Sequence, residues 1–152
     1  MSTPSLTHTY FGSTLVAGDA LTEATNGGYA VLSQTITLTS VAAGTAVSGS
    51  VVLPAGSQII NFQVDVLTAP VVGGGTASAS PITIGTAAAG TQYLSSTAAF
   101  TGGRIATTFT AAQVTAMSNI STNTSVFATV TPNGTISTTQ GVWQVTVVYS
   151  MK

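Results

Sequence analysis

The stretch "GSQIINFQVDVLTAP", Gly56 to Pro70, decides the fold class of this chain. Alternation of apolar and polar residues with a period of two is the pattern of a β-strand that has one face in a core. The stretch therefore predicts a strand whose second face meets solvent or a partner. The apolar face holds Ile60, Phe62, Val64 and Val66, and the polar face holds Asn61, Gln63 and Asp65.

The composition fits a folded domain with very little charge. The chain has 152 residues, of which 44% are hydrophobic and only 3% are charged, against about 25% in an average domain. Its polarity comes from 17 Ser and 29 Thr, and threonine suits a half-exposed strand. The mean hydropathy of +0.51 and the formal charge of −1 argue against disorder, which needs low hydrophobicity and high net charge. A net charge this small also favours association.

The few charges exclude several classes of partner. One Arg and one Lys cannot form the basic patch that binds nucleic acid. The chain has neither an amphipathic basic segment nor an apolar run of about 20 residues, so we expect no membrane partner. It has no cysteine, which excludes disulfides and thiolate metal sites. Its N-terminus lacks the basic and apolar regions of a signal peptide, so we expect synthesis in a cytoplasm without general secretion.

The chain divides into an arm, residues 1–28, and a β-sandwich domain, residues 29–152. The arm reads as irregular, with a turn at Asn26-Gly27-Gly28, although it contains several apolar side chains. A glycine-rich loop, "VVGGGTAS", lacks the lysine that a phosphate-binding loop requires. The segment around Leu94 predicts a loop with a brief turn of helix.

Strand patterns recur through the domain and are separated by Gly, Pro and Asn turns. The only helical segment is Thr110 to Met117, with Thr110 as N-cap and with Val114 and Met117 three residues apart. Trp143 alternates in phase with Val145 and predicts a core residue. Seven or eight strands with one short helix predict an all-β, antiparallel β-sandwich, in which jelly-roll and immunoglobulin-like topologies remain open. Strands are expected in segments 29–41, 48–56, 81–85, 104–110, 124–135 and 141–152.

Catalytic and metal sites find no support in the residues. His8 lies in the arm, and no "GxSxG" motif supports a serine nucleophile. Asp19 and Glu23 are four apart but have no third ligand nearby. We therefore predict no catalytic residue, no metal, no cofactor and no enzymatic activity.

Arg104 is the one cation inside the predicted domain before the C-terminal lysine. In a chain with so few charges, we expect it to pair with Asp65 or to contact a neighbouring chain; an ordinary surface arginine is the alternative. Arginine and aromatic residues are enriched at protein interfaces. Tyr10, Phe11 and Arg104 are therefore the predicted interface residues.

Three stretches resemble small structural proteins of tailed bacteriophages, including cyanophages. They are "LPAGSQIINFQVDVLTA" (53–69), "PITIGTAAAGTQYL" (81–94) and "GVWQVTVVYSM" (141–151). The resemblance is to head decoration, or cement, proteins, and it implies a jelly-roll sandwich. It further implies a homotrimer on the outer surface of a virion that clamps neighbouring major capsid proteins.

Two other functions remain open at this point. A tail-fibre, spike or adhesin module would bind a glycan through exposed aromatics, for which Tyr29, Tyr93 and Phe100 are the candidates. An enzyme such as a depolymerase is disfavoured, because the chain has no paired carboxylates in one compact segment.

Overall fold

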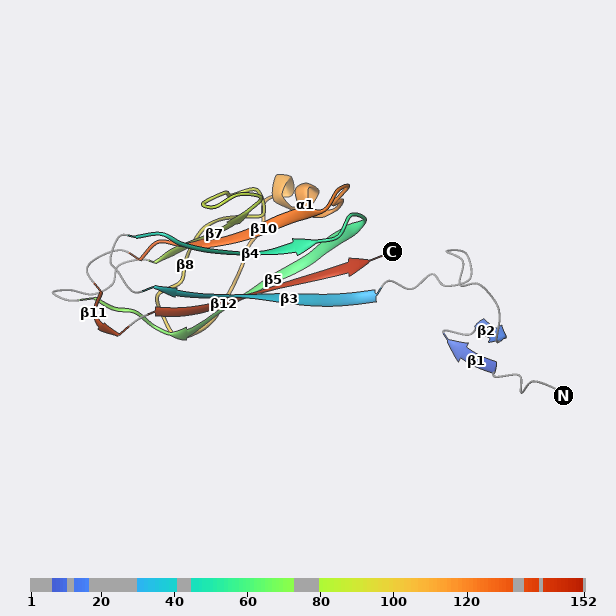
Figure 1. Ribbon diagram of the computed structural model, residues 1–152, viewed down its shortest axis with the longest axis horizontal. Coiled ribbons are helices and arrows are strands. Elements are labelled where there is room, and N and C mark those ends of the chain that lie inside the picture. The colour runs from blue at the N-terminus through green and yellow to red at the C-terminus, as the bar shows by residue number, and fades with distance from the viewer. Residues whose placement is uncertain are drawn as a thin grey trace.

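The protein is a two-layered β-sandwich (Figure 1). The computed structural model describes residues 7–10, 13–16, 30–40, 45–72, 80–132, 136–139 and 141–151. Within them, eight strands form two antiparallel four-stranded sheets, which confirms the predicted all-β sandwich. The β12 sheet has the order β3-β12-β5-β9: Ala30–Ser40, Gly141–Met151, Ser57–Thr68 and Gly103–Ile105. The β10 sheet has the order β4-β10-β7-β8: Val47–Leu53, Thr124–Val130, Pro81–Gly85 and Leu94–Ala98.

Two further pairs of strands lie outside these sheets. β6 (Val71–Val72) pairs with β11 (Ile136–Thr139). Within residues 1–28, β1 (Thr7–Tyr10) pairs with β2 (Ser13–Val16), so the predicted irregular conformation is wrong for these two segments. The predicted turn at 26–28 lies outside the described residues.

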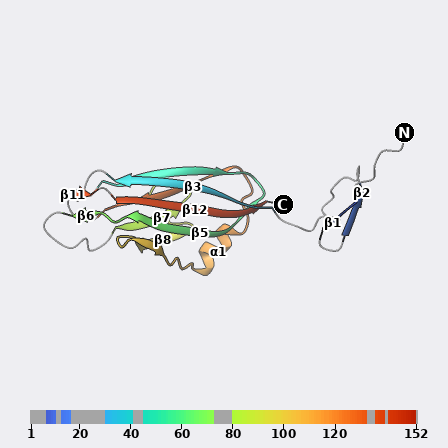
Figure 2. The same ribbon diagram turned by 90° about the horizontal axis from the view of Figure 1, so that it is seen from below.

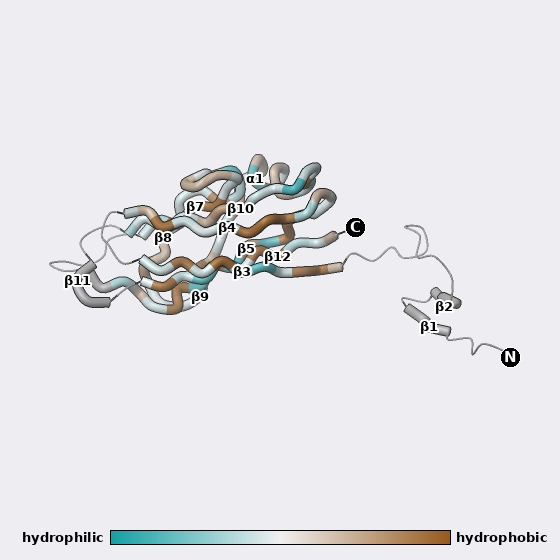
Figure 3. Tube along the Cα trace, viewed as in Figure 1, coloured by the Kyte–Doolittle hydropathy of each residue, from teal (hydrophilic) through white to brown (hydrophobic). Residues whose placement is uncertain are grey.

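The core lies between the two sheets, because each strand turns one set of alternate residues inward. Phe62, Val64 and Val66 of β5 are buried, as are Val126, Ala128 and Val130 of β10. In Figure 3, hydrophobic segments run through both layers and alternate with polar ones. The largest fully buried side chain is Trp143 of β12, whose indole Nε1 donates a 2.6 Å hydrogen bond to the carbonyl oxygen of Ala99. The predicted core position of Trp143 is confirmed.

Ile60 corrects the predicted face of β5. The sequence pattern places Ile60 inward with Phe62, but Ile60 is 48% exposed and Ile59 is buried instead. The register explains the change: Tyr149 of β12 pairs with Ile59 and Val148 pairs with Asn61, so Ile60 has no partner. A β-bulge of this kind inserts one residue and shifts the alternation before it by one position.

Two other segments differ from the sequence predictions. The loop predicted around Leu94 is wrong, because Leu94–Ala98 is strand β8 and pairs with β7. The strand predicted over 104–110 is shorter, because β9 ends at Ile105. Ala99 and Tyr93 on either side of β8 are buried, and these contacts hold the segment extended against the core.

The predicted helix is confirmed as α1, Ala111–Met117, with Thr110 as its N-cap. The Thr110 hydroxyl accepts from the backbone N–H of Gln113, and the Gln113 side chain accepts from the backbone N–H of Thr110, a capping box. Met117 is buried as expected, but the other buried residue is Gln113, whereas Val114 is exposed. The Gln113 amide donates to the Thr91 carbonyl and to the Ser95 hydroxyl, which ties the helix to β8. Among the described residues, no helix is long and apolar enough to cross a membrane.

Candidate functional site

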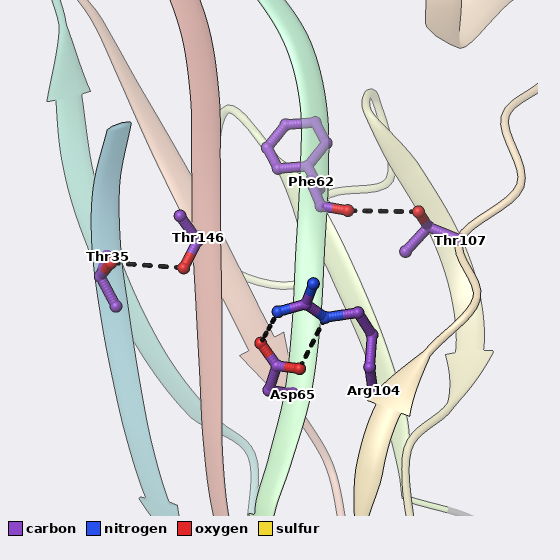
Figure 4. Close-up of polar contacts among 6 residues, drawn as sticks. All are labelled: Thr35, Phe62, Asp65, Arg104, Thr107 and Thr146. Atoms are coloured by element: carbon purple, nitrogen blue, oxygen red, sulfur yellow. Dashed lines mark hydrogen bonds and ion pairs between the residues drawn. The ribbon is translucent and has the colours of Figure 1, made fainter. Parts of the chain in front are cut away.

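The outer face of the β12 sheet carries polar side chains in ordered rows. We call it the hydroxyl face. Successive strands bring their outward residues into rows across the sheet, and one row runs through all four strands: Thr37, Gln144, Asp65 and Arg104. A second row joins Thr35, Thr146 and Gln63, and the hydroxyls of Thr35 and Thr146 lie 3.3 Å apart (Figure 4).

The one ion pair among the described residues closes the first row. Arg104 Nε donates to Asp65 Oδ1 at 2.8 Å and Arg104 Nη2 donates to Asp65 Oδ2 at 3.0 Å (Figure 4). Such a two-pronged contact matches the planar guanidinium to the carboxylate. The predicted pairing of Arg104 with Asp65 is thereby confirmed. It holds the three-residue edge strand β9 to β5, next to the hydrogen bond from the Thr107 hydroxyl to the Phe62 carbonyl.

The ion pair leaves the hydroxyl face locally neutral at ordinary pH. The hydrogen bonds from Arg104 lower the pKa of Asp65, and they outweigh the opposing effect of its partial burial. The same contact raises the pKa of Arg104. Both groups are therefore charged near pH 7, and their charges cancel within one contact.

Replacing Asp65 with asparagine is expected to lower the melting midpoint by a few degrees at most at pH 7, since exposed ion pairs contribute little. The pKa of Asp65 is lower in the folded chain than in the unfolded chain, so its contribution is present above the unfolded value. It is lost as the pH falls through the folded value. Thermal melts from pH 7 to about pH 2 should therefore show the wild-type and Asp65→Asn curves converging in acid.

The control for this prediction is Gln63→Asn, on the same face of the same strand and without an ionisable group. The difference in melting midpoint between Gln63→Asn and the wild type should stay constant with pH. If the melting midpoints of the wild type and Asp65→Asn still differ below about pH 2, the ion pair is not the cause of that difference.

The three predicted interface residues are not all placed by the structure. Arg104 lies on β9, Tyr10 is the last residue of β1, and Phe11 lies outside the described residues. Their common role in an interface thus stays a prediction. The sequence reasoning missed Thr37 and Gln144, which share the row with Asp65. Alternation predicts which residues of each strand face outward. Only the register between paired strands shows that these residues are neighbours.

Of the aromatic residues considered for glycan binding, the structure describes Tyr93 and Phe100, and neither is fully exposed. Tyr93 is buried, and its ring centroid lies 5.9 Å from that of Phe62. Burial also raises the pKa of Tyr93. Phe100 is half-buried, and Tyr29 lies outside the described residues. The prediction of Tyr93 as an exposed sugar contact is therefore wrong, and its ring is part of the core.

The described part of the chain contains no cluster of side chains that could bind a metal ion. Across the ranges that the structure describes, no group of three or more His, Cys, Asp or Glu side chains is close enough to hold a metal ion. Asp19 and Glu23, the one pair considered from the sequence, lie outside those ranges.

Comparison with known proteins gives a likeness in structure. The chain is similar to a solved chain described as "Cyanophage Pam1 capsid asymmetric unit", with a TM-score of 0.60 and 20% sequence identity. The match covers 84% of this chain and 89% of that chain. No protein-family model matches the sequence, and no curated protein matches it. At this identity the likeness shows a common fold.

Proposed function

We propose that this chain is a structural protein of a bacteriophage virion, which decorates and stabilises the capsid by bridging neighbouring major capsid proteins. The observation that carries the proposal is the fold shared with a chain of a cyanophage capsid, over most of the length of both chains. The role requires adhesion and no catalysis, in agreement with the few ionisable groups in the sequence. The expected location is the outer surface of the capsid, after synthesis in the cytoplasm of the host.

We infer a jelly-roll topology from the pairing of strands. Along the chain, the first sandwich strand β3 pairs with the last, β12, and β4 pairs with β10. Further inside the chain, β5 pairs with β9, and β7 pairs with β8. This nested pairing is the result expected when one long hairpin is rolled into two sheets, as in the jelly rolls of viral capsid proteins.

The hydroxyl face supports the proposed role on physical grounds. Its threonine and amide side chains can exchange hydrogen bonds with water for hydrogen bonds with a neighbouring protein. Its one ion pair is neutral as a unit, so copies set close together on a lattice do not repel each other through this face. We propose the face around Arg104 as one contact with the major capsid protein.

We further propose that residues 1–28 act as an arm of the domain 29–152, and that Tyr10 and Phe11 help to bind the capsid. Ordering a segment of chain on a surface costs about 1–2 kcal/mol per residue in backbone entropy. Burial of apolar side chains at about 25 cal/mol per Å² must offset that cost. Aromatic residues bury the most surface per residue and are therefore suited to this role. By the resemblance to decoration proteins, the assembled form would be a homotrimer.

Deleting residues 1–20 is expected to abolish capsid binding and to leave the sandwich folded. The two four-stranded sheets use no residue before Ala30, so the deletion removes none of their pairings. The measurement is co-sedimentation of the purified chain with capsids that lack it, where we expect more than a tenfold loss of bound protein. Circular dichroism and a melting curve check that the shortened chain is folded.

Full decoration by the shortened chain would contradict the role of the arm. Failure of the full-length chain to bind any capsid preparation would contradict the proposed function itself. Arg104→Ala gives a matched test of the hydroxyl face, because it removes an exposed side chain from an edge strand and leaves the arm intact. If the arm and the hydroxyl face both contact the capsid, Arg104→Ala should weaken capsid binding less than the deletion of residues 1–20 does.

A further inference from the structure

Among the described residues, one edge of the β12 sheet, formed by the long strand β3, has no strand paired with it. β3 spans Ala30–Ser40 and pairs with β12 over its whole length without a register shift. No strand in the described parts of the chain pairs with its other edge. An edge strand presents backbone groups that can pair with another chain, and proteins normally protect such edges with charges, prolines, bulges or short length. β3 contains no charged residue and no proline.

The opposite edges of the two sheets do carry such protection. β9 has only three residues, begins at Gly103 with a φ of +111°, and carries Arg104. β8 has five residues, and its register with β7 shifts between Ile82 and Ile84. The sandwich is therefore asymmetric. The side formed by β8 and β9 has short or irregular edge strands, whereas the side that contains β3 has a long and regular one.

β4 extends the open side to the second layer. It is the edge strand of the β10 sheet, lies against β3, and pairs with β10 without a register shift. In Figure 2, β3 and β4 (blue and teal) run along one long side, and α1 lies on the opposite side. The side chain of Gln34 links the two edges, because its amide donates to the Val52 carbonyl at 3.0 Å. β4, like β3, contains no charged residue.

We propose that the open edge of β3 binds β3 of a second copy of this chain, so that the two β12 sheets form one continuous sheet across a twofold axis. The strand is uncharged, so the same strand in antiparallel orientation meets no electrostatic repulsion. A twofold contact needs a surface complementary to itself, and an antiparallel strand pair meets that requirement through its backbone.

The pleat and the length of β3 select one register. A twofold axis that passes between residues would set core-facing side chains against outward ones, so the axis must pass through a residue pair. β3 has 11 residues, and full overlap places the axis at the central residue, Thr35. In this register Leu32 lies opposite Leu38 of the second copy, and Ser33 lies opposite Thr37.

The exposed apolar residues of β3 fit this arrangement. Leu32 is in phase with the core residues Ile36 and Leu38, yet it is 42% exposed, and Val31 beside it is 62% exposed. The first part of β3 is coloured as hydrophobic in Figure 3. A second β3 strand would place its Leu38 opposite Leu32, and the two side chains would pack together as cross-strand pairs do within one sheet.

This contact differs from the proposed homotrimer, because a twofold interface joins chains in pairs. It goes beyond the proposed function and can be measured without capsids. Two chains joined at β3 would either form a dimer or connect two trimers, and the number of chains is even in both cases.

The test is cysteine cross-linking, since the chain has no cysteine of its own. Thr35→Cys places two thiols directly across the axis, where Cβ atoms are about 4.5–5.5 Å apart, near the range of a disulfide. With mild oxidant or bismaleimidoethane, we expect most of the protein to become a covalent dimer on a denaturing gel. Two matched controls should stay uncross-linked under the same conditions.

The first control is Thr146→Cys, which removes the same hydroxyl contact with Thr35 but lies on the central strand β12. The second is Thr39→Cys, on the same strand and face as Thr35. In the proposed register, the two copies of residue 39 are eight positions apart, about 27 Å at about 3.4 Å per residue. Equal cross-linking at residues 35 and 39 would overturn the register and the contact.

Sedimentation equilibrium supplies the second measurement. The wild-type chain should contain an even number of subunits, and Thr35→Lys, which puts a charge on the axis, should halve that number. A wild-type monomer or an odd-numbered oligomer, together with no dimer from Thr35→Cys, would overturn the β3 contact. That outcome would leave capsid binding by the arm unaffected, so failure here and failure of the proposed function can be told apart.

Discussion

Replacing Trp143 with alanine is expected to lower the free energy of unfolding by about 3–5 kcal/mol, the usual cost of removing a large aromatic side chain from a core. The side chain is fully buried between the two sheets, so its removal leaves a cavity. The Ala99 carbonyl also loses the indole N–H that it accepts from, and an unpaired buried carbonyl is itself costly. Since domains are stable by about 5–15 kcal/mol, this one change can bring the chain close to unfolding at room temperature.

Urea unfolding followed by circular dichroism measures the effect. Trp143→Phe keeps a ring and loses the donor, so it should fall between wild type and Trp143→Ala. Gln144→Ala, the next residue on the outer face of the same strand, should change the free energy by less than about 1 kcal/mol. If Trp143→Ala costs no more than Gln144→Ala, the assignment of Trp143 as a core residue is wrong.

Replacing Gly141 with alanine is expected to cost about 1–3 kcal/mol through overpacking. Gly141 is buried at the start of β12, and the ring of Trp143 lies directly against its Cα. A Cβ at residue 141 would lie 2.6 Å from Cζ3 and 2.7 Å from Cζ2 of Trp143, well inside van der Waals contact. The buried indole is also held by its hydrogen bond to Ala99, so it cannot move aside freely.

A double-mutant cycle tests this explanation. In the Trp143→Ala background the clash is absent, so Gly141→Ala should cost much less there than in the wild type, with a coupling energy of about 1 kcal/mol or more. Urea unfolding of the four proteins gives the cycle. Equal costs in both backgrounds would show that the glycine is required for a reason unrelated to the tryptophan.

These effects matter for a chain with so little charge. Among the described residues the structure has one ion pair, which is exposed on the side of Arg104. Stability must therefore come mainly from the apolar core and the backbone ladders of the two sheets. The same lack of charge leaves the outer faces free of the repulsion that keeps ordinary surface strands apart.

Alternation in the sequence predicted the core-facing residues correctly where a strand is regular. In β12, alternation identified Trp143, in phase with Val145, as a core residue, and both side chains are buried. The N-cap of α1 was also readable, because the capping box depends on residues three apart in the sequence. Local periodicity and capping need no information from distant parts of the chain.

The wrong sequence predictions occur where a contact with another segment of the chain decides the local structure. Ile60 is exposed because β5 contains a bulge against β12, more than 80 positions later in the sequence. Leu94 lies in a strand because β7 pairs with the segment that follows it. In α1, the buried side chain is that of Gln113, because the Thr91 carbonyl and the Ser95 hydroxyl are present to accept its hydrogen bonds.

The sequence by itself determined that this chain is a β-sandwich with almost no charge, and it made Asp65 the candidate partner of Arg104, because few other acidic residues exist. The structure confirmed that pair. Only the tertiary structure decided which strands are neighbours. It thereby decided that Thr37, Gln144, Asp65 and Arg104 form one row, and that β3 lies at an open edge. Alternation gives each strand its inward and outward faces, whereas neighbours and register depend on contacts between residues far apart in the chain.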